Sequence, residues 1–371
     1  MAYVDRVERT STTAGGKVRK TVRYRVRYRD GAGQEHAESF ARALDAERRR
    51  AEIEMQLQEG HWLDPRRGDM PLRQWAEPWV QTRHDLRPTT RARLETTMAK
   101  QVLPTFGDVP LRRINSARIA EWVQELMGHG YSAATVRKAV FALRQCLQAA
   151  VDDRRISFNA AIRVNLPTER AKTPRFLTQR ELERLVDAMP DQYKALVLVG
   201  GYAGLRWGEA AGLTRSHIDA TRSRIIVEHT AVEVHGVVHL GQEPKTRRSK
   251  RSIPVARAVM RRIEEHLDTF VGPGADDLVF TGTHGGPLFR GTFGRHVWRP
   301  VVHAAGLDGF TFHGLRHSFV AILVAAGCNV REVSEWAGHN SVAFTLTRYG
   351  GLFADGADEA VDRLDALLGP G

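Results

Sequence analysis

TFHGLRHSFVAILVAAGCNVREVSEWAGHNSVAFTLTRYGG, residues 311–351, is the stretch whose pattern governs the fold of the C-terminal half of the chain. Its apolar residues recur at helical spacing and are interrupted twice by glycine, at Gly327 and Gly338. Glycine commonly ends a helix because it accepts the left-handed conformation there. The pattern therefore predicts three successive helices. Their cores are Phe319–Ala326, Val330–Trp336 and Val342–Arg348.

Polar side chains stand at the ends of these predicted helices. His313 and Arg316 lie three residues apart where the first helix begins, a place where backbone amides and the helix dipole favour an anion. The break at Gly338 is expected to expose His339, and the third helix delivers Tyr349 just before two glycines. Each residue alone is explained equally well by packing or by a solvated surface. Their shared stretch predicts an anion site beside a phenol.

Two basic elements precede this stretch. Arg206 opens a predicted short helix and lies three residues before Glu209, whose carboxylate would fix the guanidinium for bidentate phosphate binding. An ordinary local salt bridge is the simpler alternative. Lys245 opens a run with five basic residues in seven on a predicted hairpin, which also holds Arg247 and Lys250. A lysine among cations loses its proton more readily, which suits a general acid, whereas phosphate contact suits the rest of the run.

Taken in this order, the residues resemble the catalytic set of the tyrosine recombinase, or phage integrase, family. The motifs cover about residues 175–355, and the stretch 338–349 is especially similar to phage integrases of high-GC bacteria. The resemblance implies a set of catalytic residues supported by Glu209. They are Arg206, Lys245, His313, Arg316, His339 and Tyr349. Because Lys250 lies on the same hairpin as Lys245, the choice between the two lysines as the acid stays open.

The resemblance also implies a mechanism that uses no metal, no ATP and no other cofactor. Tyr349 attacks a DNA phosphodiester to give a 3′-phosphotyrosyl link, the arginines stabilise charge on the phosphate, and a lysine protonates the 5′ leaving group. It further implies a homotetramer on double-stranded DNA that carries core and arm attachment sites. A directionality factor and a host DNA-bending protein are candidate partners.

Several other functions fit parts of this pattern. They are an Xer-like resolvase, a type IB topoisomerase-like enzyme that relaxes DNA, a DNA-binding regulator with an idle site, and a phosphotransferase acting on other substrates. The complete catalytic set argues against an idle site, and the sequence has no phosphate-cradling Walker loop. The added N-terminal segment, in turn, is typical of integrases. We therefore expect integration and excision of a mobile element.

Composition sets wider bounds on the chain. Its 371 residues suggest two or three domains, and its net charge of +12 favours polyanions. Neither a long uncharged apolar run nor an apolar signal region is found, so we expect no membrane contact. Cys146 and Cys328 lack metal-ligand spacing and predict buried thiols in a reducing compartment. We expect a protein of the bacterial cytoplasm that works on DNA.

The N-terminal segment alternates strictly between apolar and basic residues over Val22–Arg29. This period of two predicts a strand with one apolar face and one basic face. The basic face carries Arg23, Arg25, Arg27 and Arg29. A β-sheet that reads DNA is favoured over a solvated edge.

The fold class that follows is mainly α with small β-sheets, a multidomain α+β protein. Residues 1–64 are predicted to form an arm-site DNA-binding domain with a three-stranded sheet and one helix. A helical, SAM-like core-binding domain is expected over 65–165, followed by a linker over 166–175. Within this domain Asn115 and Ser116 are expected to open a helix with Ile119 and Trp122 on its apolar stripe, and Ser132 is expected to cap the next helix. The catalytic domain is expected over 176–355 and a tail helix over 356–371. In the catalytic domain, Thr178 and Glu181 predict a capping box that starts a helix, residues 224–230 predict a strand, and residues 231–240 predict a second through a turn at Gly236.

Overall fold

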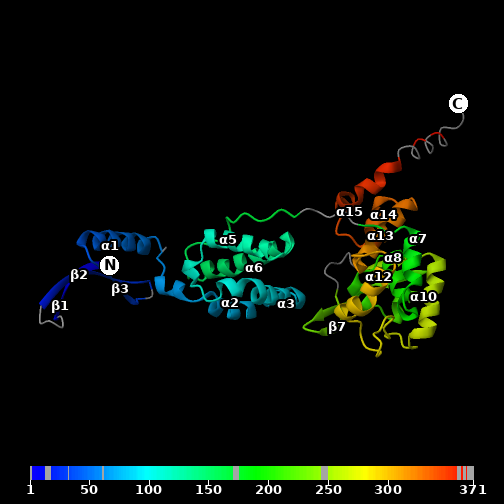
Figure 1. Cartoon of the computed structure of the whole chain (residues 1–371), viewed down its shortest axis with the longest axis horizontal. Coiled ribbons are helices and arrows are strands. Elements are labelled where there is room, and N and C mark those ends of the chain that lie inside the picture. Colours follow the sequence, from blue (N-terminus) through cyan, green and yellow to red (C-terminus); the bar gives the residue numbers. More distant parts are fainter. Residues whose placement is uncertain are drawn as a thin grey trace. The chain divides into compact units, whose positions relative to one another are not determined.

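The structure, a computed structural model, describes residues 2–12, 18–31, 33–60, 62–169, 175–243 and 250–356, together with Val361 and Asp365. The chain divides into two compact units, residues 1–169 and 170–371, which are described separately (Figure 1). The division falls inside the predicted linker. None of the described helices has the length and apolar character needed to cross a membrane.

The first unit begins with an antiparallel sheet in the order β1-β2-β3. The strands and the helix that follows them are β1 (Tyr3–Thr12), β2 (Val18–Arg29), β3 (Glu35–Phe40) and α1 (Ala43–Gln58). The predicted alternation is confirmed, because Val26 and Tyr28 are buried on one face of β2 and pack with Ile53 of α1. Apolar burial therefore holds the helix on this face of the sheet.

The rest of the first unit is helical and has its own apolar core. Its helices are α2 (Leu72–Gln81), α3 (Pro88–Thr97), a π-helical turn (Met98–Val102), α4 (Leu103–Phe106), α5 (Ser116–Gly128) and α6 (Ala133–Asp152). The side chains of Asn115 and Ser132 cap α5 and α6 by accepting backbone N–H groups. Ile119 and Trp122 on α5 are buried as predicted.

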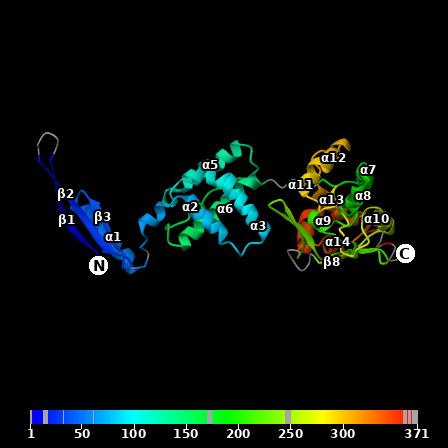
Figure 2. The same cartoon turned by 90° about the horizontal axis from the view of Figure 1, so that it is seen from below.

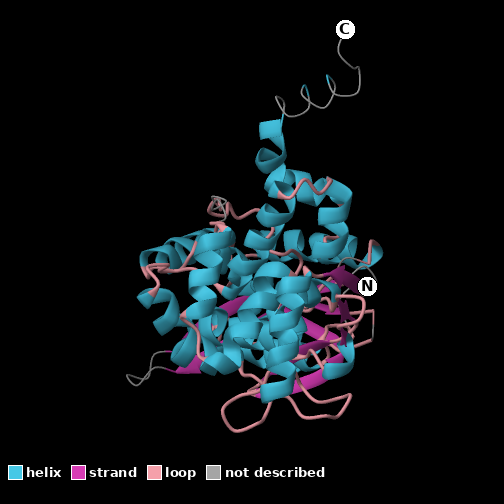
Figure 3. Ribbon diagram, turned by 90° about the vertical axis from the view of Figure 1, so that its right-hand side faces the viewer, coloured by secondary structure: helices cyan, strands magenta, loops and turns pink. Residues whose placement is uncertain are grey.

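The second unit is mixed, with helices and two small sheets among its described residues (Figure 3, helices cyan and strands magenta). Its helices are α7 (Gln179–Asp187), α8 (Asp191–Tyr202), α9 (Trp207–Ala211), α10 (Arg257–Phe270), α11 (Arg290–Phe293), α12 (Arg299–Ala304), α13 (Phe312–Ala325), α14 (Val330–Ala337) and α15 (Val342–Tyr349). A capping box at Thr178 starts α7, as predicted. Helices α13, α14 and α15 confirm the three successive helices that were predicted over residues 311–351.

The strands of the second unit differ from the prediction in one respect. They are β4 (Ile218–Asp219), β5 (Arg224–Val227), β6 (Thr230–Val234), β7 (Val237–Gln242) and β8 (Arg251–Pro254). The predicted strand over residues 224–230 is interrupted after Val227, and its two parts join different sheets. β5 pairs with β4 and β8, whereas β6 pairs only with β7 among the described strands. The predicted turn at Gly236 is present, with φ at 77°.

Helices α8 and α13 pack closely in the second unit, and both views place them side by side (Figures 1 and 2). The contact needs glycine: a Cβ atom on Gly200 would lie 2.6 Å from Cδ1 of Leu315. This packing brings the C-terminal end of α8, and the loop after it, against α13. The candidate site is built at that junction.

Candidate active site

Arg316 is the most deeply buried charged residue of the site, with 2% of its surface exposed. Its Nη1 donates to the carbonyl oxygen of Gly204 at 2.7 Å. Its Nη2 is also buried and has no hydrogen-bond partner among the described residues. Burial, followed by the charges of Arg206 and Arg251, lowers the pKa of Arg316. Because a buried cationic donor without an acceptor is costly, this nitrogen indicates a place for an anion.

Arg206 precedes α9 and is braced by Glu209, as predicted from their spacing. Its Nη1 donates to Oε1 of Glu209 at 2.8 Å, and its Nη2 donates to the carbonyl oxygen of Gly338 at 2.8 Å. Gly338 has a left-handed backbone with φ at 60°, which glycine adopts without strain. The guanidinium is therefore tied both to its own helix and to the residue beside His339.

Glu209 has a second partner that the sequence prediction did not include. Arg251, at the start of β8, donates from Nη1 and Nη2 to the two carboxylate oxygens at 3.0 and 2.8 Å, and both side chains are buried. Burial raises the pKa of Glu209, but the hydrogen bonds and charge of Arg251 and the charge of Arg206 lower it to about 2. Arg251 is the last residue of the basic run that Lys245 opens, and no contact with Glu209 was predicted for it. The pair lies 42 residues apart in sequence, so local spacing gives no sign of it.

His339 corrects one prediction. The break at Gly338 was expected to expose this side chain, but His339 is 7% exposed. The helix α15 folds back over it, and Nδ1 of His339 lies 2.8 Å from the buried hydroxyl of Thr345. Burial and the charges of Arg316 and Arg206 lower the pKa of His339 to about 3. The imidazole is therefore neutral at physiological pH.

Tyr349 ends α15 and points into the site instead of toward solvent, with 3% of its surface exposed. Its ring stacks on the His339 ring at a centroid distance of 5.7 Å and an interplanar angle of 8°. Burial raises the pKa of Tyr349, while the charges of Arg316 and Arg348 oppose that rise. The phenol, His339 and Arg316 thus share one environment.

The phenol has a further partner that the sequence prediction missed. Nδ1 of His317 lies 2.6 Å from the hydroxyl oxygen of Tyr349. His317 stands four residues after His313 on α13, so the two rings lie on the same helical face and meet edge to face at 4.8 Å. That spacing in the string HGLRHS was a usable signal. Burial is the largest cause that lowers the pKa of His313. The charges of Arg316 and Arg206 lower it further.

The electrostatic balance of this site favours an anion. Three guanidinium groups, those of Arg206, Arg251 and Arg316, share the site with Glu209, which is the one buried carboxylate in the described part of the chain. The remaining positive charge has no counterpart among the buried described residues. A tetrahedral phosphate oxyanion, which accepts planar guanidinium donors, is suited to such a site.

The basic run that was predicted on a hairpin lies in sequence between β7 and the first residue of β8, and these strands belong to different sheets, so the run is not part of the described hairpin β6–β7. The run is described only in part. Lys245 and Arg247 lie outside the described residues, and their assignments stay predictions. Lys250 is described and half exposed, with its Nζ 3.9 Å from Oε1 of Glu243. The hairpin β6–β7 itself is largely exposed to solvent.

The basic face of β2 is less uniform than the sequence pattern predicted. Arg27 pairs with Asp5 of β1 at 3.0 Å and with Glu35 of β3 at 3.2 Å. Both carboxylates come from neighbouring strands, which period-two counting within one strand does not reveal. For Arg23, Arg25 and Arg29 the described structure shows no such ion pair, and their DNA contacts stay predictions.

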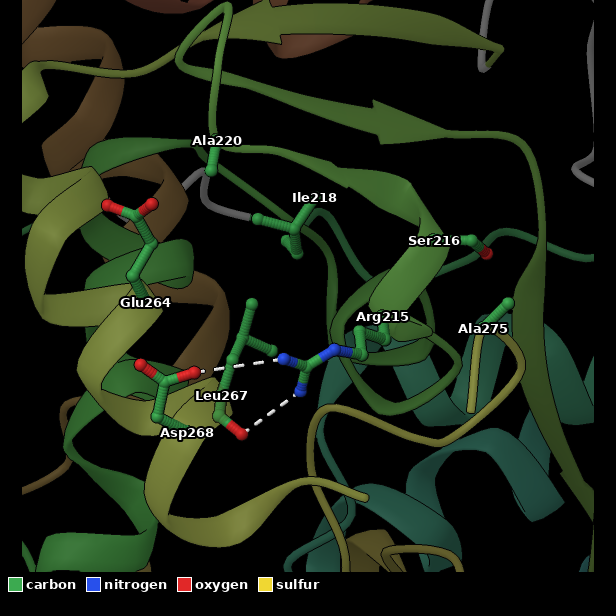
Figure 4. A pocket seen from close by; sticks show the side chains of 8 residues that line it. All are labelled: Arg215, Ser216, Ile218, Ala220, Glu264, Leu267, Asp268 and Ala275. Carbon is green, nitrogen blue, oxygen red and sulfur yellow. Dashed lines mark hydrogen bonds and ion pairs between the residues drawn. The ribbon is translucent and has the colours of Figure 1, made fainter. Parts of the chain in front are cut away.

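Two other features of the second unit lie outside this site. A shallow pocket beside α10 is lined by Arg215, which donates to the carbonyl oxygen of Leu267 at 3.1 Å and pairs with Asp268 at 3.7 Å (Figure 4). Arg215 therefore binds the C-terminal part of α10. Elsewhere, one nitrogen each of His217 and His229 and one oxygen of Glu228 lie within 4.8 Å of one another. This is the one group of potential metal ligands found among the described residues.

Comparison with known proteins gives consistent matches over both units. The sequence model of the phage integrase family matches residues 175–354, and that of the phage integrase N-terminal SAM-like domain matches residues 72–127. The chain is 29% identical over 327 residues to the predicted phiRv2 prophage integrase of Mycobacterium tuberculosis strain CDC 1551, covering 83% of each protein. It is 26% identical to the integrase of Mycobacterium phage D29, covering 89% of this chain and 90% of that integrase.

Solved structures show the same fold. The Tn1549 transposon integrase in complex with a circular intermediate DNA has a TM-score of 0.65 at 22% identity, covering 80% of this chain and all of that one. A lambda integrase dimer bound to a COC′ core site has a TM-score of 0.59 at 16% identity, covering 94% and 95%. The fold predicted from the sequence, mainly α with small sheets, is confirmed.

Proposed function

We propose that this chain, which belongs to the phage integrase family of tyrosine-type site-specific recombinases, integrates and excises a mobile DNA element. Such an enzyme cleaves and rejoins DNA strands through a covalent link to tyrosine. The observation that carries the proposal is the buried Nη2 of Arg316, which lacks an acceptor in the described structure, in the same site as a buried tyrosine.

In the proposed reaction each side chain acts where its contacts hold it. Arg206 and Arg316 bind the non-bridging oxygens of the scissile phosphate and stabilise the charge that builds up during attack. Glu209, held by Arg251, keeps Arg206 oriented. These guanidinium groups are fixed before DNA arrives, so little reorganisation is needed at the moment of reaction.

The remaining roles concern protons and the nucleophile. Tyr349 attacks the phosphorus atom, and its ring position is fixed by the stacked ring of His339. His339 and His313 donate hydrogen bonds to the phosphate oxygens. Lys245 protonates the departing 5′ oxygen, with Lys250, which precedes β8, as the alternative acid. The energy of the phosphodiester is kept in the phosphotyrosyl link, so religation needs no ATP.

We also retain the domain assignment proposed from the sequence. Residues 1–64 bind arm sites, 65–165 bind the core site, 166–175 link the units, 176–355 carry out the chemistry, and 356–371 form a tail helix. The DNA partner is supported by the relatives, which include DNA-bound integrases. A homotetramer on DNA is proposed because a lambda integrase tetramer is known on a Holliday junction. A directionality factor and a DNA-bending protein are proposed as further partners.

Recombination between the DNA sequences that flank the gene tests this function. The full-length protein should join a candidate pair of attachment sites on two plasmids, and the Tyr349→Phe protein should not. Recombination between two copies of one chromosomal site, without activity on the attachment pair, would support the Xer-like alternative and overturn the proposal. Relaxation of supercoiled DNA without strand exchange would also overturn the proposal, and it would support the topoisomerase alternative.

A further inference from the structure

The hydroxyl group of Tyr349 is held by His317, a residue to which the mechanism above gives no role. The phenol oxygen and Nδ1 of His317 are 2.6 Å apart, and their ring centroids are 5.7 Å apart. Tyr349 comes from α15 and His317 from the second turn of α13. The contact therefore joins the nucleophile to the helix that also carries Arg316.

The direction of this hydrogen bond depends on the protonation of both groups and on the tautomer of His317. Burial raises the pKa of Tyr349, so the phenol keeps its proton. Burial, with the charges of His313, Arg348 and Arg316, lowers the pKa of His317 to about 4, so the imidazole is neutral. When the proton of the neutral imidazole is on Nε2, Tyr349 donates its O–H and Nδ1 of His317 accepts. We assign this tautomer to His317, because only in it can Nδ1 take the phenolic proton. The free lone pair of the imidazole already faces the proton that must leave before a phenolate can attack.

The groups around this pair explain why the proton stays on the phenol in the absence of DNA. His313 meets the His317 ring edge to face, and Arg316 and Arg348 act on both residues. On the opposite side His339 stacks on the phenol and is neutral. The surroundings of an imidazolium at His317 are therefore cationic. A DNA phosphate bound between the arginines would offset that charge and make protonation of His317 easier.

We propose that His317 is a catalytic residue whose Nδ1 accepts the phenolic proton of Tyr349 as the phenol oxygen attacks the scissile phosphate. The step rests on the proposed function. The bond from the Tyr349 oxygen to phosphorus forms, the bond from phosphorus to the 5′ oxygen breaks, and the O–H proton moves to His317. The 5′ oxygen takes a separate proton from the lysine acid. Religation runs the same transfers in reverse, so His317 returns its proton to the phenol.

Two substitutions separate the acceptance of a proton from the placement of the phenol. His317→Asn puts an amide near the position of Nδ1, which accepts a hydrogen bond but is not basic. His317→Ala removes both properties. His296→Gln is the matched control, because His296 is exposed on the same unit and outside the site. All are made in the full-length protein and measured by covalent adduct formation on a nicked suicide substrate across pH.

The proposal predicts that both His317 variants form the adduct on the order of 10²-fold more slowly at neutral pH. Their rates should rise about tenfold per pH unit toward alkaline pH, as solvent replaces the lost base and phenolate accumulates. The control should match the wild-type profile. If His317→Asn cleaves at the wild-type rate, or if both variants are slower by one constant factor at every pH, His317 only positions the ring and the proposal is overturned.

A substrate with sulfur in place of the bridging 5′ oxygen identifies which proton is affected. A thiolate leaves without protonation, so this substrate should restore a variant that lacks the lysine acid but not His317→Asn. Restoration of His317→Asn would place the residue at the leaving group and overturn the inference. Absence of any adduct with the wild-type protein, in contrast, would contradict the proposed function itself and would be seen before the variants are compared.

Discussion

At the scale of single residues, the site is organised around one carboxylate. Glu209 accepts hydrogen bonds from Arg206 and from Arg251, and so joins the start of α9 to the start of β8. A buried ion pair contributes little net stability compared with apolar packing, but loss of one partner leaves an uncompensated charge. The pair is therefore expected to fix the geometry of Arg206 and to make substitutions here costly.

Replacement of Glu209 by glutamine tests this role. Glu209→Gln removes the negative charge that the buried Arg251 and Arg206 hold, so we expect a loss of about 3 kcal/mol in the free energy of unfolding of the second unit. Glu265→Gln, an exposed site on α10, is the control and should change stability by less than about 0.5 kcal/mol. Urea titration of the full chain, followed by a probe in the second unit, measures both. Equal stabilities for the two variants would contradict the account.

The same carboxylate predicts a pH dependence. The folded pKa of Glu209 lies near 2, below its usual value of 4.5, so its ionised form is favoured by folding. Its contribution is complete above about pH 4.5 and is lost as pH falls toward 2. The stability difference between wild type and Glu209→Gln should therefore shrink over this acid range. A difference that stays constant from neutral pH down to 2 would show that folding does not lower the pKa of Glu209.

Sequence reasoning succeeded at this scale where partners are close in sequence. Arg206 and Glu209 are three residues apart, and their contact was predicted from helical spacing. Arg251 is 42 residues from Glu209, and Tyr349 is 32 residues from His317, so both contacts depend on tertiary packing. His339 was expected to be exposed because a helix ends before it. The prediction was wrong because it took no account of α15 folding back over that side chain.

At the scale of elements, α13 is the framework of the site. It carries His313, Arg316 and His317, and it packs on α8 and on the loop that ends at Arg206. Gly204 in that loop accepts the Nη1 hydrogen bond of Arg316 and has φ at 63°. A Cβ atom there would lie 2.2 Å from Cδ1 of Phe319 on α13. The loop can approach the helix only because residue 204 is glycine.

Two glycine substitutions separate backbone strain from this close approach. Gly204→Ala places an alanine in the left-handed backbone region and brings its Cβ atom into a clash with the Phe319 ring. We therefore expect the free energy of unfolding to fall by roughly 2–5 kcal/mol, and DNA cleavage to be lost. Gly327→Ala is the matched control: its φ is 80°, but no atom lies within 4 Å of the added Cβ. Gly327→Ala should lower the free energy of unfolding by only about 1 kcal/mol. Thermal unfolding compares the two, and equal losses would contradict the packing argument.

The elements themselves were largely predictable from local signals. Capping residues and apolar stripes fixed α5, α6, α7 and the three C-terminal helices to within a few residues, because these signals act within one or two turns. The strand over residues 224–230 was wrong in its extent. Its alternation continues past Val227, and only the pairing partners, β8 for one part and β7 for the other, decide where each sheet ends.

At the scale of the whole molecule, the two units carry different predicted roles on DNA. The site of the second unit accounts for cleavage, whereas the sheet of the first unit is proposed to hold arm sites. The net charge of +12 gives affinity for DNA in general but does not identify a surface. On β2, ion pairing with Asp5 and Glu35 distinguishes Arg27 from the other three arginines.

That difference supplies a prediction for arm-site binding. The triple variant Arg23→Gln, Arg25→Gln and Arg29→Gln should bind arm-site DNA more weakly, with a smaller dependence on salt, since each lost phosphate contact removes about 0.9 from the log–log slope. Arg27→Gln should have a smaller effect, and core-site cleavage should be unchanged in both proteins. Filter binding over a range of salt concentrations measures this. Unchanged arm-site binding by the triple variant would refute the sheet as a DNA reader.

The central claim is that Tyr349 forms the covalent link to DNA at the site of Arg206 and Arg316. The most direct measurement is mass spectrometry of the peptide that remains attached to DNA after the full-length protein has cleaved a nicked suicide substrate and been digested. The account predicts that the attached peptide carries the modification on Tyr349, and that Tyr349→Phe binds the substrate with unchanged affinity but gives no adduct. An adduct on another residue, or one that persists in Tyr349→Phe, would contradict it.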